Sequence, residues 1–284
     1  RASRGHQQTG RPHVAGGGDR IQPARHVGGI FAGTCACERP RCMRKFEHTG
    51  RCTPVEKASG TGLMNDIAHD LESWRLSELD HCYGPNVHIL NDPYYATMLA
   101  SLCSPETRQP MFNRLIRRLY EGLCRAVINN EFPRKFRRIR TRMAATTDRA
   151  VVGAGFLAPE TEVIVVDIVR AGILPAMTCY DVLNESLNPE RIRQDHLVMQ
   201  RKTDETGAVV GAEMSGTKIG GPVEGRHILF PDPMGATGSS ICQAIEYYSQ
   251  SLDGKPGPII PMNLIVTPQY IRALTQAFPD AKLY

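Results

Sequence analysis

The pattern of apolar and polar residues divides the chain near residue 64. Residues 1–63 show almost no apolar periodicity and are rich in Gly, Arg, His, Pro and Thr. Such a composition buries too little apolar surface to offset the entropy that a chain loses on folding. We therefore expect residues 1–63 to be a disordered leader or non-native upstream sequence, and residues 64–284 to form one folded domain.

The first apolar periodicity after the leader is helical. A weak helical pattern covers residues 65–79, and clearer patterns predict helices over 93–102 and 106–128. A basic run, FPRKFRRIRTR, follows at residues 132–142. It has two interpretations, a phosphate or nucleic-acid patch and a solvated face beside a dimer contact, and we favour the second.

Strands and helices alternate through the rest of the chain. Residues 163–169 (VIVVDIV) are almost continuously apolar and β-branched, which is typical of a strand that is buried on both faces. The further predicted elements are strands at 196–200, 225–231 and 258–267, helices at 174–183, 239–252 and 269–278, and the start of one more strand at 281–284. This alternation predicts an α/β fold with a mostly parallel twisted sheet flanked by helices. In such sheets, ligands bind beyond the carboxyl ends of the strands.

Charge and apolar content narrow the possible partners. The net charge of +5 is too small to be a nucleic-acid signature, but it suits a site that attracts a diphosphate. No stretch is apolar for long enough to cross a bilayer, and the N-terminus lacks the apolar run of a secretory signal. We therefore expect small-molecule partners, with no membrane or nucleic acid involved.

Nine cysteines are scattered over the whole length, unlike the dense framework of a small secreted protein. We expect reduced thiols in a cytoplasmic protein. A metal site built from Cys35, Cys37, Cys42 and Cys52 is an alternative for the leader, but their spacing is irregular for zinc. An organellar transit peptide is another, although the Gly and Pro content argues against the amphipathic helix that it needs.

The strongest chemical motif follows the strand at 225–231. Small residues let the backbone wrap closely round a ligand, and the helix that begins at 239 adds free N–H groups and a positive dipole end. The acid at the strand end can accept hydrogen bonds from ribose hydroxyls. The predicted binding residues are Asp232, Pro233, Met234, Gly235, Ala236, Thr237, Gly238, Ser239 and Ser240. The loop is neither a Walker loop nor a dinucleotide fingerprint, and the alternative is a Gly-rich turn that only links strand to helix.

A second motif ends the strand at 163–169. Arg170 is followed by two small residues, Ala171 and Gly172. A guanidinium can bind a diphosphate there, and exposed amides can approach it. Alone the signal is weak, because a single arginine at a strand end is more often part of a surface ion pair.

These two motifs resemble those of a known family. Residues 232–240 (DPMGATGSS) resemble the phosphoribosyl-diphosphate loop of type I phosphoribosyltransferases, and in detail the Asp-Pro-Met-x-Ala-Thr-Gly-Gly-Ser loop of uracil phosphoribosyltransferases. Ser239 stands where the second Gly of that loop usually lies. Residues 168–172 (IVRAG) resemble the family's Ile-Leu-Arg-Ala-Gly diphosphate loop, and the likeness extends over residues 86–284.

The resemblance implies transfer of phosphoribosyl from 5-phosphoribosyl 1-diphosphate to uracil, which gives UMP and diphosphate in pyrimidine salvage. It makes Asp232 and Arg170 the catalytic residues, and it places Arg201 and Lys202 on a mobile flap at residues 199–206. It also implies Mg²⁺ held through phosphoribosyl diphosphate, with no metal ligands from the protein, and a homo-oligomer, most simply a dimer.

The resemblance also leaves a gap. The family's base-recognition run, similar to Tyr-Ile-x-Pro-Gly-Leu-Gly-Asp, does not occur in this sequence. We therefore expect either a C-terminally truncated chain or a changed base specificity. Two other functions stay open: a phosphoribosyltransferase acting on another base, and a non-catalytic nucleotide-sensing or RNA-binding regulator on the same fold, which only the basic run supports.

Overall fold

The structure is a computed structural model that describes residues 74–203 and 209–284, without the side chains of residues 201–212. The expectations of a disordered leader over residues 1–63 and of a metal site at residues 35–52 lie outside these ranges. Within the described ranges, no helix is both long and apolar enough to span a membrane.

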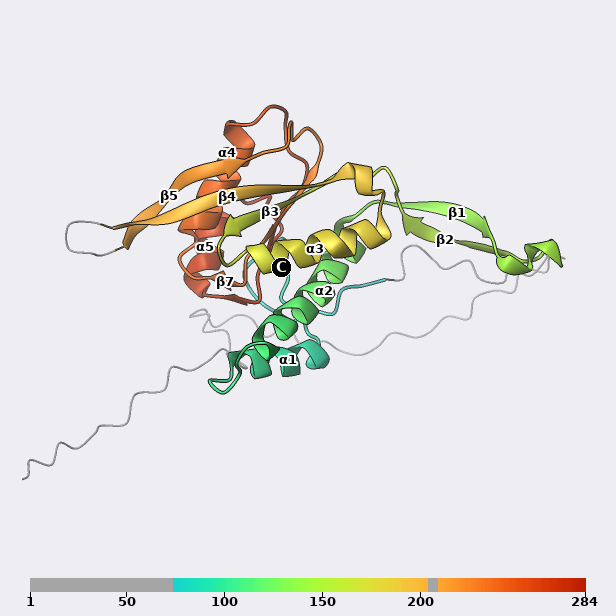
Figure 1. The fold of residues 1–284 in the computed structure, drawn as a ribbon, viewed down its shortest axis with the longest axis horizontal. Helices are drawn as coiled ribbons and strands as arrows, with labels where there is room; N and C mark the ends of the chain where they lie inside the picture. Colours follow the sequence, from blue (N-terminus) through green and yellow to red (C-terminus); the bar gives the residue numbers. More distant parts are fainter. Residues whose placement is uncertain (1–73, 204–208) are drawn as a thin grey trace, which may run out of the picture. The chain divides into compact units, whose positions relative to one another are not determined.

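A five-stranded sheet forms the centre of the described domain (Figure 1). Its strands, in spatial order, are β5 (Val209–Lys218), β4 (Ile192–Thr203), β3 (Val163–Val169), β6 (His227–Pro231) and β8 (Ile259–Met262). The four strands from β4 to β8 run parallel, and β5 is antiparallel at the edge. The predicted α/β fold with a mostly parallel sheet is therefore confirmed.

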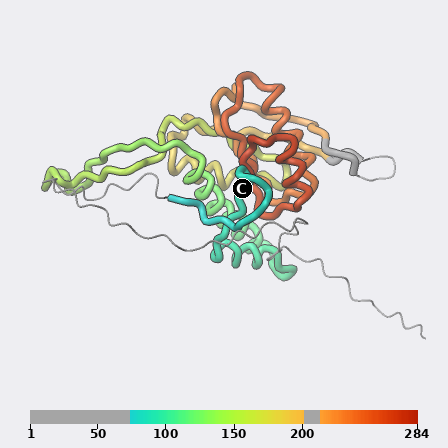
Figure 2. Tube along the Cα trace, turned by 180° about the vertical axis from the view of Figure 1, so that it is seen from behind, coloured from blue at the N-terminus to red at the C-terminus, as the bar shows by residue number. Residues whose placement is uncertain are grey.

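Helices cover both faces of this sheet because its central strand is apolar on both sides. In β3, Val163 and Val165 contribute to the core under α2 (Met111–Glu131) and α3 (Ile173–Ser186). Ile164 and Val166 point the other way, into the core under α4 (Ser239–Gln250) and α5 (Pro268–Ala277). Figures 1 and 2 show the two helix pairs on opposite sides of the strands. A further helix, α1 (Pro93–Cys103), packs against α2.

The basic run at 132–142 folds into a hairpin that the sequence did not predict. Strand β1 (Arg134–Arg140) pairs antiparallel with β2 (Val151–Leu157), and a short 3-10 helix, η1 (Arg142–Ala145), lies near the turn. Figure 1 shows the hairpin standing away from the helices. Neither strand alternates between apolar and polar residues, so the sequence pattern did not predict a strand at either place. Six of the seven residues of β1 are exposed, in keeping with a solvated face.

The N-terminal part of the described domain is extended where a helix was expected. The prediction of a helix over 65–79 is wrong for residues 74–79, which are not helical. The amide of Leu79 donates to the carbonyl of Ile89, 2.8 Å away, and Glu78 forms a β-bridge with Leu90. These bonds to a distant segment outweigh the weak helical pattern.

The predicted strand at 258–267 is two strands. The first, β8, ends at Met262, and β9 (Ile265–Val266) leaves the main sheet to pair in parallel with β7 (Met234–Gly235). This break brings the segment that precedes α5 against the loop after β6. It was invisible in the sequence because the residues on both sides of the break are apolar.

The last residues lie beside β8, as expected for a further extended segment. The amide of Tyr284 donates to the carbonyl of Pro261 at 3.0 Å, and Leu283 forms a parallel bridge with Val87. Figure 2 shows this end of the chain beside the segment that leads into α1. A short 3-10 helix, η2 (Pro189–Arg191), precedes β4 and completes the described elements.

Candidate functional site

The two predicted loops lie next to each other at one edge of the sheet. The loop at residues 170–172 follows β3, and the loop at residues 232–238 follows the neighbouring parallel strand β6. Gly172 packs so closely on the end of β6 that a Cβ there would lie 3.1 Å from the carbonyl oxygen of Pro231. The fold therefore brings the predicted diphosphate loop and the predicted phosphate loop together.

Four carbonyl groups of the 232–238 loop, those of residues 232, 233, 235 and 236, are bonded to residues 263–267. In a trans peptide the next N–H points the opposite way, so the bonds to the carbonyls of residues 235 and 236 turn the amides of Ala236 and Thr237 to the other side of the loop. The bonds are from Asn263 Nδ2 to Asp232 O (2.6 Å), from the amides of Leu264 and Ile265 to Pro233 O (3.3 and 3.1 Å), from the amide of Thr267 to Gly235 O (2.9 Å), and from the Thr267 hydroxyl to Ala236 O.

The N–H groups of the same loop are the candidate donors for an anion. None of the described residues accepts a hydrogen bond from the amides of Thr237, Gly238 or Ser240. These amides stand at the start of α4, where a helix concentrates unpaired donors and the positive end of its dipole. Gly238 has φ 88°, a left-handed conformation that strongly favours glycine. The Thr237 and Ser239 hydroxyl oxygens lie 3.1 Å apart at the same place.

Asp232 presents a largely buried carboxyl group at the start of the loop. Its backbone is held on both sides, because its amide donates to Met262 O at 3.0 Å and its carbonyl accepts from Asn263. Burial raises the pKa of the Asp232 carboxyl from 3.8 to about 6, and a 3.4 Å hydrogen bond from the amide of Met234 acts in the opposite direction. A carboxylate with so few partners of its own is suited to receive hydroxyl groups of a ligand.

Arg170 is exposed at the start of the neighbouring loop. Its guanidinium pairs with no acidic side chain among the described residues, so it is available to an anion. The peptide bond between Val169 and Arg170 is cis. Ala171 is also exposed, whereas Gly172 is buried under the end of β6. This arrangement fits a diphosphate beside the phosphate loop better than it fits a surface ion pair.

Comparison with known proteins now decides the family. The sequence model of the family described as uracil phosphoribosyltransferase matches residues 89–284, which is more than half of the chain. The chain belongs to the uracil phosphoribosyltransferase family. The family resemblance predicted from the sequence is thereby confirmed.

Two individual relatives show how far this likeness extends. A uracil phosphoribosyltransferase from Mycoplasmoides gallisepticum is 40% identical over 58 residues, which cover 20% of this chain and 28% of that protein's length. The match thus spans little more than a quarter of that relative. The structure of the AQ2163 protein from Aquifex aeolicus covers 69% of this chain and 84% of its own, with a TM-score of 0.55 and 17% identity, and it supports the fold alone.

The segment predicted to be a flap, residues 199–206, begins in β4, which pairs with β5 in a hairpin. Arg201 and Lys202 lie in β4, opposite Ala212 and Gly211 of β5. Their side chains lie outside the described part, and so does residue 206. Their proposed role over the diphosphate stays a prediction.

A buried ionic cluster joins the base of this hairpin to α4. The Asp195 carboxylate is fully buried and accepts from the Arg193 guanidinium at 3.0 Å and from the amide of Gly220 at 2.9 Å. It also accepts from the hydroxyl of Tyr248 on α4, at 2.9 Å. Burial raises the pKa of Tyr248, and the neighbouring Asp195 charge raises it further. Asp195 therefore connects α4, the helix that follows the 232–238 loop, to the β4–β5 hairpin.

Sequence reasoning missed the residues that support the phosphate loop from behind, namely Asn263, Thr267 and Tyr270. The Tyr270 ring fills the space behind Gly235, where a Cβ would lie 2.7 Å from the ring. The Tyr270 hydroxyl donates to Asn263 Oδ1 at 2.9 Å. The Thr-Pro pair at 267–268 is a helix-start signal that could have revealed the capping role of Thr267. The predicted strand at 258–267 included Thr267 instead.

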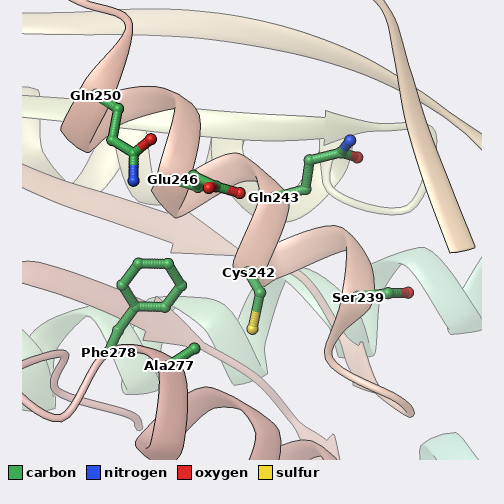
Figure 3. A pocket seen from close by; sticks show the side chains of 7 residues that line it. All are labelled: Ser239, Cys242, Gln243, Glu246, Gln250, Ala277 and Phe278. Carbon is green, nitrogen blue, oxygen red and sulfur yellow. The ribbon is translucent and has the colours of Figure 1, made fainter.

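A shallow cavity of about 500 Å³ lies between α4 and α5 (Figure 3). Its lining residues are Ser239, Cys242, Gln243, Glu246, Gln250, Ala277 and Phe278. It touches the phosphate loop only through Ser239. Burial raises the pKa of the Cys242 thiol, and the Glu246 charge raises it further, so this cysteine is a poor nucleophile. The cavity adjoins the loop at Ser239 and otherwise lies along α4 and the end of α5.

Proposed function

We propose that this chain transfers the phosphoribosyl group of 5-phosphoribosyl 1-diphosphate to uracil, giving UMP and diphosphate. One observation carries the proposal: the loop carbonyls of residues 232, 233, 235 and 236 are bonded to residues 263–267, so the unpaired amides of the loop can hold a 5-phosphate beside the Asp232 carboxylate. Membership of the uracil phosphoribosyltransferase family supports uracil as the acceptor.

In this proposal, Asp232 holds the ribose. Its ionised carboxylate accepts hydrogen bonds from the 2- and 3-hydroxyls, while the amides of Thr237, Gly238 and Ser240 fix the 5-phosphate. Two anchor points set the ring position, which reduces the entropy that the reaction must lose. Displacement at the anomeric carbon develops positive charge on the ring, and a nearby carboxylate stabilises that charge.

The departing diphosphate is held by cations of the protein. Arg170 binds it from the loop after β3, and Arg201 and Lys202 approach it from the flap. These charges stabilise the leaving group as the bond to the anomeric carbon lengthens. Base and phosphoribosyl group react directly, so no side chain of the protein acts as a nucleophile.

We expect magnesium to reach this site together with the diphosphate of the substrate. Mg²⁺ prefers oxygen ligands and keeps several waters, so the diphosphate oxygens would hold it. When bound, it supplies charge neutralisation of the diphosphate.

The test is UMP formation from labelled uracil by the whole chain, with Arg170→Ala as the key variant. We expect a loss of about 100-fold or more in kcat/KM, because removing one donor from a developing anion costs about 10²–10³. Arg272→Ala, at an exposed position on α5, is the matched control and should retain activity.

Three outcomes separate the alternatives. UMP formation that depends on Arg170 supports the proposal. Binding of phosphoribosyl diphosphate with no UMP, and turnover of a competing base, would assign the enzyme to another base. A chain that does not bind phosphoribosyl diphosphate at all would refute the proposal.

A further inference from the structure

Thr267 makes three hydrogen bonds that join the phosphate loop to α5. Its hydroxyl donates to Ala236 O, and the same oxygen accepts from the amide of Tyr270 at 3.1 Å, which caps α5. Its own amide donates to Gly235 O at 2.9 Å. The side chain of Thr267 therefore begins a helix and fixes the carbonyl of Ala236, while its backbone amide fixes the carbonyl of Gly235.

Peptide geometry turns these bonds into a statement about the anion site. In a trans peptide the C=O and the N–H of the next residue lie in one plane and point in opposite directions. Fixing the carbonyl of Gly235 thus orients the amide of Ala236, and fixing the carbonyl of Ala236 orients the amide of Thr237. Both amides are directed away from Thr267, toward the side where the phosphate is expected.

We propose that Thr267 is a positioning residue that preorganises the phosphate-binding amides of the loop. It touches no substrate atom and acts through the two peptide units that it holds. This inference rests on the proposed function, because it assumes that the loop binds a sugar phosphate. Donors that are already oriented need no rearrangement when the anion arrives, and this raises affinity.

Three substitutions separate the loop contact from the helix cap. Thr267→Ser keeps both side-chain bonds, to Ala236 O and to the amide of Tyr270. Thr267→Val has a similar shape but loses both of these bonds. Thr267→Asp keeps a cap, because a carboxylate accepts well at this position, but it cannot donate to Ala236 O. The readouts are the Kd of ribose 5-phosphate, measured by calorimetry on the whole chain, and the Tm.

The expected pattern differs between the two readouts. Ser should bind within about twofold of the wild type, and Val and Asp should bind about three- to tenfold more weakly, the equivalent of one hydrogen bond. Val should lower the Tm by about 2–4 °C through the lost cap, whereas Asp should leave it nearly unchanged.

A second helix provides the control for general destabilisation. Asp92 caps α1 through the amides of Tyr94 and Tyr95, at 3.0 and 3.2 Å, and lies outside the site. Asp92→Ala should lower the Tm as Thr267→Val does, with no change in the Kd. If it weakens phosphate binding equally, the effect of Thr267 is only that of stability and the proposal is wrong.

The charge of the aspartate variant is controlled by salt. Repulsion between a carboxylate and the phosphate fades as ionic strength rises, whereas a lost hydrogen bond does not. Weak binding in Thr267→Asp that recovers in salt, with normal binding in Thr267→Val, would overturn the role of Thr267. No binding by the wild type would overturn the proposed function as well, so the two failures can be told apart.

Discussion

Asparagine at position 232 should make the protein more stable and inactive at the same time. Asp232→Asn removes the negative charge but keeps the shape and an acceptor for the amide of Met234. In the native protein, burial raises the pKa of this carboxyl from 3.8 to about 6. The folded state is therefore penalised for holding the carboxylate that the proposed reaction needs.

The size of the penalty follows from the shift. A difference of about 2 pKa units corresponds to about 3 kcal/mol, at about 1.4 kcal/mol for each unit. The Asn variant escapes this cost, so its free energy of unfolding should rise by about 3 kcal/mol at pH 8. For a domain of this size, that is an increase in Tm of about 6–12 °C.

The sign of the pH dependence is fixed by the same shift. Between pH 3.8 and about 6 the folded protein holds the proton and the unfolded chain has released it. Stability of the wild type therefore falls as pH rises through this window, and the full cost is present above about pH 6. The advantage of Asp232→Asn should grow from about 1 kcal/mol at pH 4.5 to about 3 kcal/mol at pH 8.

Urea unfolding of both proteins at several pH values measures this difference, and the UMP assay measures the lost activity. Asp280→Asn changes an exposed carboxylate and should show no such trend. Asp232→Asn that is less stable than the wild type at pH 8, or that has an advantage independent of pH, would refute the reasoning. Wild-type activity in this variant would refute the catalytic role.

Two further substitutions test the support of the loop and of the flap. Gly235→Ala should lower the free energy of unfolding by about 1–3 kcal/mol and weaken phosphate binding, because its methyl group would lie 2.7 Å from the Tyr270 ring. Chemical denaturation measures this loss, and Gly216→Ala, whose methyl group would lie 3.8 Å from Val198, is the control that should lose less. Tyr248→Phe should cost about 1–3 kcal/mol, because it removes a hydrogen bond from a buried carboxylate. Tyr247→Phe, whose hydroxyl has no hydrogen-bond partner among the described residues, should cost less than half as much, and equal losses in a thermal melt would contradict this account.

The predictable part of the fold was the part with strong local patterns. The continuous apolar run at 163–169 is β3 to the residue, and the helix start at Ser239 is where the hydroxyl-rich loop ends. The β1–β2 hairpin was missed because its strands hold together by backbone pairing, with arginines and glycines where alternating apolar residues would be expected.

The residues of the candidate site also fall into those that a local motif predicts and those that it does not. Asp232 and Arg170 carry side-chain chemistry that a motif can reveal. Asn263 and Thr267 act on carbonyl groups some 30 residues earlier in the chain, and such long-range bonds have no local signal. These bonds form because the chain breaks after β8 and places β9 beside β7, an arrangement that only the structure shows.

Recognition by main-chain amides limits how this site can change. The side chain of Met234 is 59% exposed and points away from the packed core, so many residues could replace it without altering the donors. Ser239 in place of a second glycine is tolerable for the same reason. Redesign of this protein for a different phosphorylated sugar should therefore begin with the supporting segment at 263–267, because substitution of the exposed loop side chains of Met234 and Ser239 should leave the orientation of the amides unchanged.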